Sequence, residues 1–331
     1  MKRLIYERHG DPTEVLRLIE TPDPQPGPGQ VRIRMKVMTI NPADLLTIEG
    51  RYGARPEPLP DTPGFGGYGI VDAVGDGVTR LAPGDAVLPL ARGQWADTLV
   101  IDARLAAPAP AGGDPEQAAM MRANPSTAEL MLRAYVDLQP GDWVVQNAAN
   151  SAVGRLVARF ARDRGLRSVN IVRRADVADS LRADGADAVI IDRGQEDITA
   201  AIHAATGGAL PRLGLDAIGG AATGALAAAL SDGGTVVVYG LLSGQPCAID
   251  ARDLVFRDIR LRGFWLSAWY GGASADEIRH LNGFVAEQFA AGRLSVDVAG
   301  RYRLADHVAA MRHAAAGGRD GKILFTGGSD A

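Results

Sequence analysis

Apolar and polar side chains alternate along residues 31–37, in the first third of the chain. Two further strand candidates, residues 69–74 and 86–90, are bounded by turns that contain Gly. Alternation with a period of two is typical of a strand with one buried face. Because Pro and Gly residues interrupt these segments, as between residues 22 and 29, we expect a compact β-rich domain.

The pattern changes near residue 120, and from residue 143 onward short apolar runs alternate with amphipathic segments of helical period. Strands are predicted at residues 143–146, 168–172, 188–191, 213–216 and 235–239, and helices at residues 153–161, 177–184, 197–205 and 222–230. A succession of strands and helices with right-handed connections predicts a parallel sheet that is covered by helices on both faces. We therefore expect an α/β protein with a doubly wound domain.

The segment after residue 266 returns to a mixed pattern. Helices are predicted near residues 276–291 and 305–316, and a last strand at residues 322–325. A chain of 331 residues is long enough for two domains, and we assign this tail to the first domain. The predicted boundaries are 1–120 with 268–331 for the β-rich domain and 121–267 for the doubly wound domain.

The composition narrows the range of partners. The formal net charge is −4, so the chain lacks the bulk positive charge on which nonspecific nucleic-acid binding depends. One cysteine, Cys247, supports neither an internal disulfide nor a cysteine-based zinc site, and the five histidines lack metal-ligand spacing. We predict no metal. Without a signal-peptide pattern or an apolar run near ~18 residues, we expect no membrane partner and a cytoplasmic location.

Small residues fill the loop that follows the first strand of the doubly wound domain. Residues 147–154 read Asn-Ala-Ala-Asn-Ser-Ala-Val-Gly and open a predicted helix. Small side chains let a pyrophosphate approach the backbone amides at a helix N-terminus, so this loop predicts a dinucleotide site. The usual three-glycine fingerprint is absent, and the alternative is a plain turn between strand and helix.

The second strand of this domain ends in Arg173 and Arg174, where an NAD enzyme usually places a carboxylate. Two guanidinium groups can pair with the 2′-phosphate of a dinucleotide. We therefore predict that NADPH is preferred over NADH. The alternative is a solvated pair of arginines in a surface loop.

Four stretches carry a resemblance to a known family: residues 41–52, 124–128, 146–154 and 261–267. They resemble the mitochondrial-type trans-2-enoyl thioester reductases, a zinc-free branch of the medium-chain dehydrogenase/reductase superfamily. The turn at residues 73–87 is similar to that of the superfamily as a whole. The resemblance implies a Rossmann domain that binds NADPH and a GroES-like catalytic domain.

The resemblance also implies site residues. Tyr52 matches the family's active-site residue, and Asn124 and Lys322 match cofactor contacts. Further implied cofactor contacts are Asn150, Ser151, Ala152, Val153, Arg173, Arg174, Tyr239, Gly240, Leu241, Leu242, Phe264, Trp265 and Leu266. Asn41, Trp95 and Trp269 are candidates for a substrate pocket, although for each aromatic residue packing in the core is the alternative.

The sequence departs from the family pattern at three positions. Gly66 stands where the family usually has an acidic residue, Ala152 where a glycine is usual, and Ala175 where a basic residue is usual. These departures bear on the substrate more than on the fold or the cofactor.

The implied reaction is hydride transfer to the β-carbon of an enoyl thioester, with Tyr52 as candidate proton donor and acyl-CoA or acyl carrier protein as the bound form of the substrate. The enzymatic alternative is a quinone or enone reductase, and the alternative from another class is a non-catalytic NADPH-binding protein. Residues 259–266 are predicted to form the last strand of the nucleotide-binding sheet. In the superfamily this strand pairs across a two-fold axis, which implies a homodimer.

Overall fold

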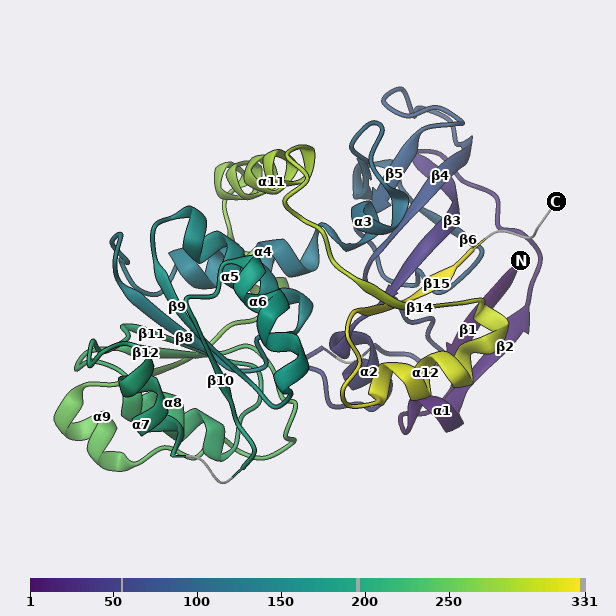
Figure 1. Cartoon of the computed structure of the whole chain (residues 1–331). Helices are drawn as coiled ribbons and strands as arrows, with labels where there is room; N and C mark the ends of the chain where they lie inside the picture. Colours follow the sequence, from purple (N-terminus) through teal and green to yellow (C-terminus); the bar gives the residue numbers. More distant parts are fainter. Residues whose placement is uncertain (55, 195–196, 328–331) are drawn as a thin grey trace. The chain divides into compact units, whose positions relative to one another are not determined.

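Residues 1–54, 56–194 and 197–327 are described by the computed structural model, in which the chain divides into two units (Figure 1). Met1–Ala123 and Val285–Ala331 form the first unit, and Asn124–Phe284 forms the second. The chain therefore returns to the first unit inside helix α11 (Ala275–Ala290), which differs from the predicted boundary after residue 267. The ring of Phe284 packs edge-on against Phe160 of the second unit, with centroids 5.2 Å apart.

The first unit is built on a mostly antiparallel sheet with the order β14-β15-β3-β4-β5-β7, and β6 also pairs with β3. The strands are β3 (Gln30–Ile40), β4 (Gly67–Val74), β5 (Ala86–Pro89), β6 (Thr98–Asp102), β7 (Ala106–Pro108), β14 (Val298–Tyr302) and β15 (Lys322–Thr326). β14 and β15 are parallel, whereas the other pairs are antiparallel. Val31, Ile33 and Met35 alternate into the core, as the period of two predicts.

The remaining elements of the first unit surround this sheet. They are the hairpin of β1 (Lys2–Tyr6) and β2 (Leu16–Glu20), and the helices α1 (Pro12–Val15), α2 (Pro42–Ile48), α3 (Pro115–Met120) and α12 (His307–Ala315). β15 brings the end of the chain back to this unit, because Ile323 pairs with Ile40 of β3. The last strand of the chain thus pairs with the sheet of the first unit.

Six parallel strands form the sheet of the second unit, in the order β10-β9-β8-β11-β12-β13. They are β8 (Trp143–Gln146), β9 (Arg167–Val172), β10 (Ala188–Ile191), β11 (Leu213–Asp216), β12 (Thr235–Val238) and β13 (Arg260–Gly263). The order runs outward from β8 in both directions, so the switch point lies between β8 and β11. The predicted doubly wound fold is confirmed.

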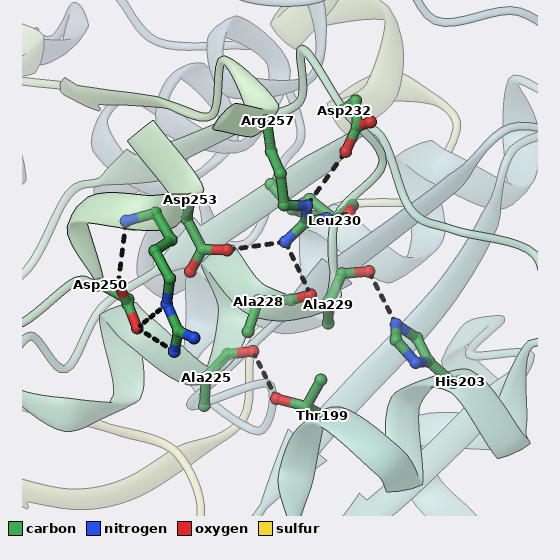
Figure 2. A network of polar contacts seen from close by, with 11 residues as sticks. Thr199, His203, Ala225, Ala228, Ala229, Leu230, Asp232, Asp250, Asp253 and Arg257 are labelled. Atoms are coloured by element: carbon green, nitrogen blue, oxygen red, sulfur yellow. Dashed lines mark hydrogen bonds and ion pairs between the residues drawn. The ribbon is translucent and has the colours of Figure 1, made fainter. Parts of the chain in front are cut away.

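Helices lie on both faces of this sheet, with α5 (Ala152–Asp163) and α6 (Ala178–Asp184) on one side and α7 (Ile198–Ala205) and α8 (Ala221–Ala229) on the other (Figure 1). The other helices of this part of the chain are α4 (Ala123–Arg133), α9 (Ala251–Arg257) and α10 (Leu266–Gly272), and α11 spans the boundary between the units. Figure 2 shows how Arg257 fixes the end of α9: its Nη1 donates to Asp253 at 2.8 Å and to the carbonyl oxygen of Ala228 at 3.2 Å. His203 on α7 contacts the carbonyl oxygen of Ala229, so α7 and α8 are joined as well.

The last strand of the sheet is shorter than predicted. The prediction covers residues 259–266, whereas β13 ends at Gly263, which pairs with Val238 at the end of β12. Because a strand persists only where a neighbour supplies hydrogen-bond partners, the pairing stops where β12 stops. The chain then turns into α10 at Leu266.

Candidate cofactor and catalytic site

A buried polar pair holds the loop after β8 to the loop after β11. The Nδ2 of Asn147 donates to the Oδ1 of Asp216 at 2.7 Å, and the Oδ1 of Asn147 accepts from the backbone N–H of Ala217 at 2.8 Å. Both side chains are buried. The sequence analysis missed both residues, although a polar residue at the end of a buried strand (Asp216) or directly after one (Asn147) is a signal that could have found them.

Further donors satisfy the Asp216 carboxylate. The hydroxyl of Thr223 donates to it at 2.6 Å, and the backbone N–H groups of Ile218 and Gly219 donate at 2.8 and 3.0 Å. A buried carboxylate with this many donors is compensated for its loss of water. The loops at the switch point are therefore held in one arrangement, which is what a preformed crevice requires.

The helix after β8 begins at a tight approach of backbone to backbone. Ser151 is the N-cap of α5, and its Oγ accepts from the backbone N–H of Gly154 at 3.1 Å. A Cβ added at Gly154 would lie 2.5 Å from the carbonyl oxygen of Ala149. Ala148 has a φ of 47°, in the left-handed region. Glycine is thus required at position 154, and the amide end of α5 lies directly beyond strand β8.

Parallel strands present their carboxyl ends at one edge of a sheet, and most predicted cofactor contacts of the second unit lie there. The residues that follow β8, β9, β12 and β13 are Asn150, Ser151, Ala152, Val153, Arg173, Arg174, Tyr239, Gly240, Leu241, Leu242, Phe264 and Trp265. The fold therefore brings the four segments together. Their contact with a cofactor remains a prediction.

The loop after β12 is tied to the loop after β11. A Cβ added at Gly240 would lie 2.4 Å from the carbonyl oxygen of Ala217, and the backbone N–H of Leu242 donates to the same oxygen at 3.1 Å. The side chains of Leu241 and Leu242 are 52% and 61% exposed. Two apolar side chains thus stand out at the edge where a dinucleotide is expected.

The aromatic residues after β13 differ in their surroundings. Phe264 packs edge-on against Tyr135, whose hydroxyl donates to the carbonyl oxygen of Gly263 at 3.0 Å. Trp265 is 39% exposed. Trp269 lies on α10 and packs edge-on against Tyr270. Three further predicted site residues lie elsewhere: Leu266 opens α10, Asn124 is buried in α4, and Lys322 is in the first unit.

A second polar cluster lies in the first unit, around the start of α2. The Nζ of Lys322 donates to the Oδ1 of Asn41, and the Nδ2 of Asn41 donates to the Oγ1 of Thr39 at 2.8 Å. The backbone N–H of Asn41 donates to the Oδ2 of Asp44 at 2.7 Å. The structure thus brings together Asn41 and Lys322, two site residues that the sequence places 281 positions apart.

Burial shifts the two ionisable groups of this cluster toward their neutral forms. Asp44 is fully buried, and burial raises the pKa of its carboxyl to about 7, although the hydrogen bond from Asn41 and the charge of Lys322 oppose this shift. Burial likewise lowers the pKa of Lys322 to about 8. Sequence analysis missed Asp44, although an Asn followed by Asp three residues later resembles a helix capping box, which the structure shows.

The position of Gly66 borders this cluster. A Cβ added there would lie 2.7 Å from the Oγ1 of Thr39, which donates to the carbonyl oxygen of Gly66 at 3.1 Å. A larger residue at this position requires that Thr39 moves. The hydroxyl of Thr39 thus occupies the space that a side chain at position 66 would need.

Tyr52 follows α2 in the first unit. Its backbone N–H donates to the carbonyl oxygen of Leu46 at 3.0 Å, and its half-buried ring lies 5.8 Å from that of Phe65 at an interplanar angle of 52°. The guanidinium of Arg92 lies over Phe65, 4.9 Å from the ring centre. Backbone and ring contacts thus hold the predicted active-site tyrosine within its unit.

Trp95 does not line a channel, contrary to its selection as a pocket candidate. Its side chain is fully buried, its Nε1 donates to the carbonyl oxygen of Thr39 at 3.1 Å, and its ring packs edge-on against Phe325 at 5.2 Å. The indole N–H has a partner and the ring is enclosed, so Trp95 belongs to the core of the first unit.

Two general features complete the description of the site. Within residues 1–54, 56–194 and 197–327, no group of three His, Cys, Asp or Glu side chains is arranged to hold a metal ion. In the same described part of the chain, no helix combines the length and apolar character needed to cross a membrane.

Two protein-family models match the chain. Residues 27–111 match the alcohol dehydrogenase GroES-like domain, and residues 152–284 match the zinc-binding dehydrogenase model. The matches fall in the two units separately, the first within the β-rich unit and the second within the doubly wound unit. They agree with the predicted combination of a GroES-like and a Rossmann domain.

Known proteins resemble the chain over nearly its whole length. The human mitochondrial enoyl-[acyl-carrier-protein] reductase is 36% identical over 326 residues, which cover 94% of this chain and 84% of the human protein. The Escherichia coli quinone oxidoreductase complexed with NADPH has a TM-score of 0.89 at 27% identity, covering 98% and 100% of the two chains. The Etr1p/NADP/crotonyl-CoA complex has a TM-score of 0.85 at 26% identity, covering 98% and 99%.

The predicted cytoplasmic location is contradicted by these comparisons. The curated enoyl-[acyl-carrier-protein] reductases of human, rat and Arabidopsis that resemble the chain are all mitochondrial. The prediction was wrong because it depended on the lack of a secretory pattern and of a membrane span, and these features do not separate cytoplasm from organelle.

Proposed function

This chain belongs to the enoyl-[acyl-carrier-protein] reductase family of the medium-chain dehydrogenase/reductase superfamily, and we propose that it reduces the carbon–carbon double bond of a trans-2-enoyl thioester with NADPH. The resemblance inferred from the sequence motifs is confirmed by the family comparison. The observation that carries the proposal is the edge of the second unit, where the small-residue loop after β8 and the two arginines after β9 follow neighbouring parallel strands.

The residues at this edge fit a dinucleotide. The small-residue loop leads into the N-terminus of α5, which we propose faces the pyrophosphate, and Arg173 and Arg174 offer charge to a 2′-phosphate. When bound, NADPH supplies the hydride that reduces the double bond. The chain supplies orientation, and we propose that Tyr239, Gly240, Leu241 and Leu242 flank the nicotinamide side. The proposed contacts at Asn124, Leu266 and Lys322 follow from the family resemblance.

Tyr52 is the proposed proton donor. Reduction at the β-carbon places negative charge on the thioester carbonyl oxygen, and a proton must then reach the α-carbon. We propose that the Tyr52 hydroxyl donates this proton, either to the enolate oxygen or directly to the α-carbon. In the first unit Asn41 stays a candidate substrate contact, and its amide is held in place by Lys322. In the second unit Trp269 stays a candidate from the sequence alone.

We propose that the substrate is a small thioester, presented as acyl-CoA or on acyl carrier protein. Etr1p, with crotonyl-CoA and NADP in its complex, supports a CoA thioester as the first substrate to test. We also propose a homodimer. β13 lies at one end of the sheet order among the described strands, and its four residues are exposed. Such an edge is a template for pairing with a second copy.

A quinone or enone reductase is the second candidate. The similarity to E. coli quinone oxidoreductase, whose TM-score of 0.89 exceeds the 0.85 of the Etr1p complex, favours it. Both reactions use the same cofactor, and they differ in the acceptor of the hydride.

A substrate panel tests these alternatives. We expect NADPH oxidation with crotonyl-CoA, much slower oxidation with a quinone, and slower turnover with NADH. Faster oxidation with the quinone would instead support the second candidate. NADPH binding without turnover of either substrate would favour a non-catalytic NADPH-binding protein.

A further inference from the structure

A carboxylate faces one of the two arginines in the loop after β9. The Nε of Arg174 donates to the Oδ1 of Asp176 at 2.9 Å, and the Nη2 of Arg174 pairs with the Oδ2 of the same carboxylate. Two parallel contacts of this kind engage one whole edge of the guanidinium. The side chain of Arg174 is 34% exposed and that of Asp176 is 62% exposed, so the pair is open to solvent.

We propose that Asp176 is a specificity-determining residue of the cofactor site, which competes with the 2′-phosphate of NADPH for Arg174 and thereby narrows the preference for NADPH over NADH. This inference rests on the proposed function, because it requires that the adenosine ribose lies at the end of β9.

Geometry and charge both support competition. Carboxylate and phosphate are anionic acceptors for the same guanidinium N–H groups, and the N–H groups that Asp176 engages are not available to a second acceptor. The hydrogen bond from Arg174 lowers the pKa of the Asp176 carboxyl, which keeps the competitor ionised. NADH carries no 2′-phosphate, so its binding does not require the release of Arg174.

Arg173 differs from Arg174 in this respect, because its side chain is exposed and lies one residue closer to the strand. On this proposal Arg173 binds the 2′-phosphate directly. Arg174 binds the phosphate only when its ion pair with Asp176 breaks. The chain thus has two basic residues with unequal roles, which a count of positive charges does not reveal.

A neighbouring ion pair offers a matched control. On α6, the Nη1 of Arg182 pairs with the Oδ1 of Asp179 at 2.7 Å, and Asp179 is 98% exposed. Asp179→Asn removes the same charge only three residues away, without touching Arg174. A difference between Asp176→Asn and Asp179→Asn therefore separates competition for Arg174 from a general change of local charge.

The test uses the full chain and two nucleotides that differ by the 2′-phosphate, 2′,5′-ADP and 5′-AMP, with calorimetry as the measurement. We expect Asp176→Asn to lower the Kd for 2′,5′-ADP about two- to fivefold, because the free energy of an exposed ion pair corresponds to a change of Kd of about this size. The Kd for 5′-AMP is expected to stay unchanged. Asp179→Asn is expected to change neither. In an Arg174→Gln background, Asp176→Asn is expected to have no effect on 2′,5′-ADP.

Each other outcome refutes the inference. An unchanged or weaker affinity of Asp176→Asn for 2′,5′-ADP, or equal tightening for both nucleotides, means that Asp176 does not compete for Arg174. An effect that persists in the Arg174→Gln background has the same meaning. Wild-type protein that binds neither nucleotide would refute the nucleotide site of the proposed function, and this result is distinct from the others.

Discussion

The Nζ of Lys322 donates a hydrogen bond to the Oδ1 of Asn41, which joins the first residue of β15 to the residue that precedes α2. Asp44, three residues after Asn41, accepts from the Asn41 backbone. One amide side chain and its backbone thus lie between a buried ammonium and a buried carboxyl. Because each charge loses water on folding, the cluster is sensitive to the protonation of its members.

Asp44→Asn is expected to change how stability depends on pH. Burial raises the pKa of Asp44 from 3.8 to about 7, so the folded chain holds the proton more tightly than the unfolded chain. This contribution to stability is fully present below about pH 4 and is lost as the pH rises through 7. The variant keeps an acceptor for Asn41 but does not titrate. Its free energy of unfolding should therefore rise relative to wild type between pH 5 and pH 7, by on the order of a few kcal/mol.

Urea denaturation at several pH values measures this difference. Asp179→Asn, which removes an exposed carboxyl, serves as the control and is expected to follow the wild-type curve. Parallel curves for wild type and Asp44→Asn would show that the Asp44 carboxyl is not held in its neutral form.

Tyr52→Phe is expected to lower kcat about 100-fold or more with crotonyl-CoA, because a positioned proton donor contributes about that much to a rate. The affinity for NADPH should stay unchanged, since the ring contact with Phe65 is kept. Steady-state kinetics and an NADPH titration measure the two effects. Tyr302→Phe is the control, because the Tyr302 hydroxyl contacts His313 and has no proposed role. Near-normal turnover of Tyr52→Phe would exclude the proton-donor role.

The sequence predicted the parts of the fold that depend on local pattern. Period-two alternation located β3, a short apolar segment ended by glycines located β4, and the alternation of strands and helices located the parallel sheet. The end of β13 was missed because it is set by the length of its neighbour β12, a distant segment. The return of the chain inside α11 was missed for a similar reason, since the Phe284 contact with Phe160 depends on tertiary packing.

In the candidate site, too, local motifs were found and residues that depend on distant partners were missed. Short motifs located the loop after β8 and the arginines after β9, because such signals are local. Asp44, Asn147 and Asp216 were missed because their roles depend on partners brought together by the sheets. Trp95 was chosen for its residue type alone, and its partner Phe325 lies far away in the sequence.

The two arginines are expected to discriminate between the cofactors. Arg173→Ala should raise the KM for NADPH about tenfold or more, since a charge-assisted hydrogen bond to phosphate is lost, while the KM for NADH stays unchanged. Arg174→Ala should have a smaller effect, because Asp176 already engages this side chain. The measurement is the ratio of kcat/KM for the two cofactors, with Arg182→Ala as the control. Equal losses with NADPH and NADH would contradict a role in phosphate binding.

Gly154→Ala is expected to destabilise the protein and weaken NADPH binding together. The added Cβ would lie 2.5 Å from the carbonyl oxygen of Ala149, a backbone atom, and the position of a Cβ is fixed by its own backbone, so the loop or the start of α5 must shift. Overpacking of this kind costs about 1–3 kcal/mol. The same shift displaces the amide end of α5 from the carboxyl end of β8, where the pyrophosphate is expected.

Gly283→Ala provides the contrast, because a Cβ at this helical position in α11 meets no atom within 4 Å. In an exposed helix alanine is favoured over glycine by about 1 kcal/mol, so this variant should be as stable as wild type or more stable. Thermal unfolding and an NADPH fluorescence titration measure both variants. Loss of stability in Gly154→Ala without loss of NADPH affinity would separate the packing role of Gly154 from cofactor binding. The pyrophosphate would then have to lie away from the start of α5.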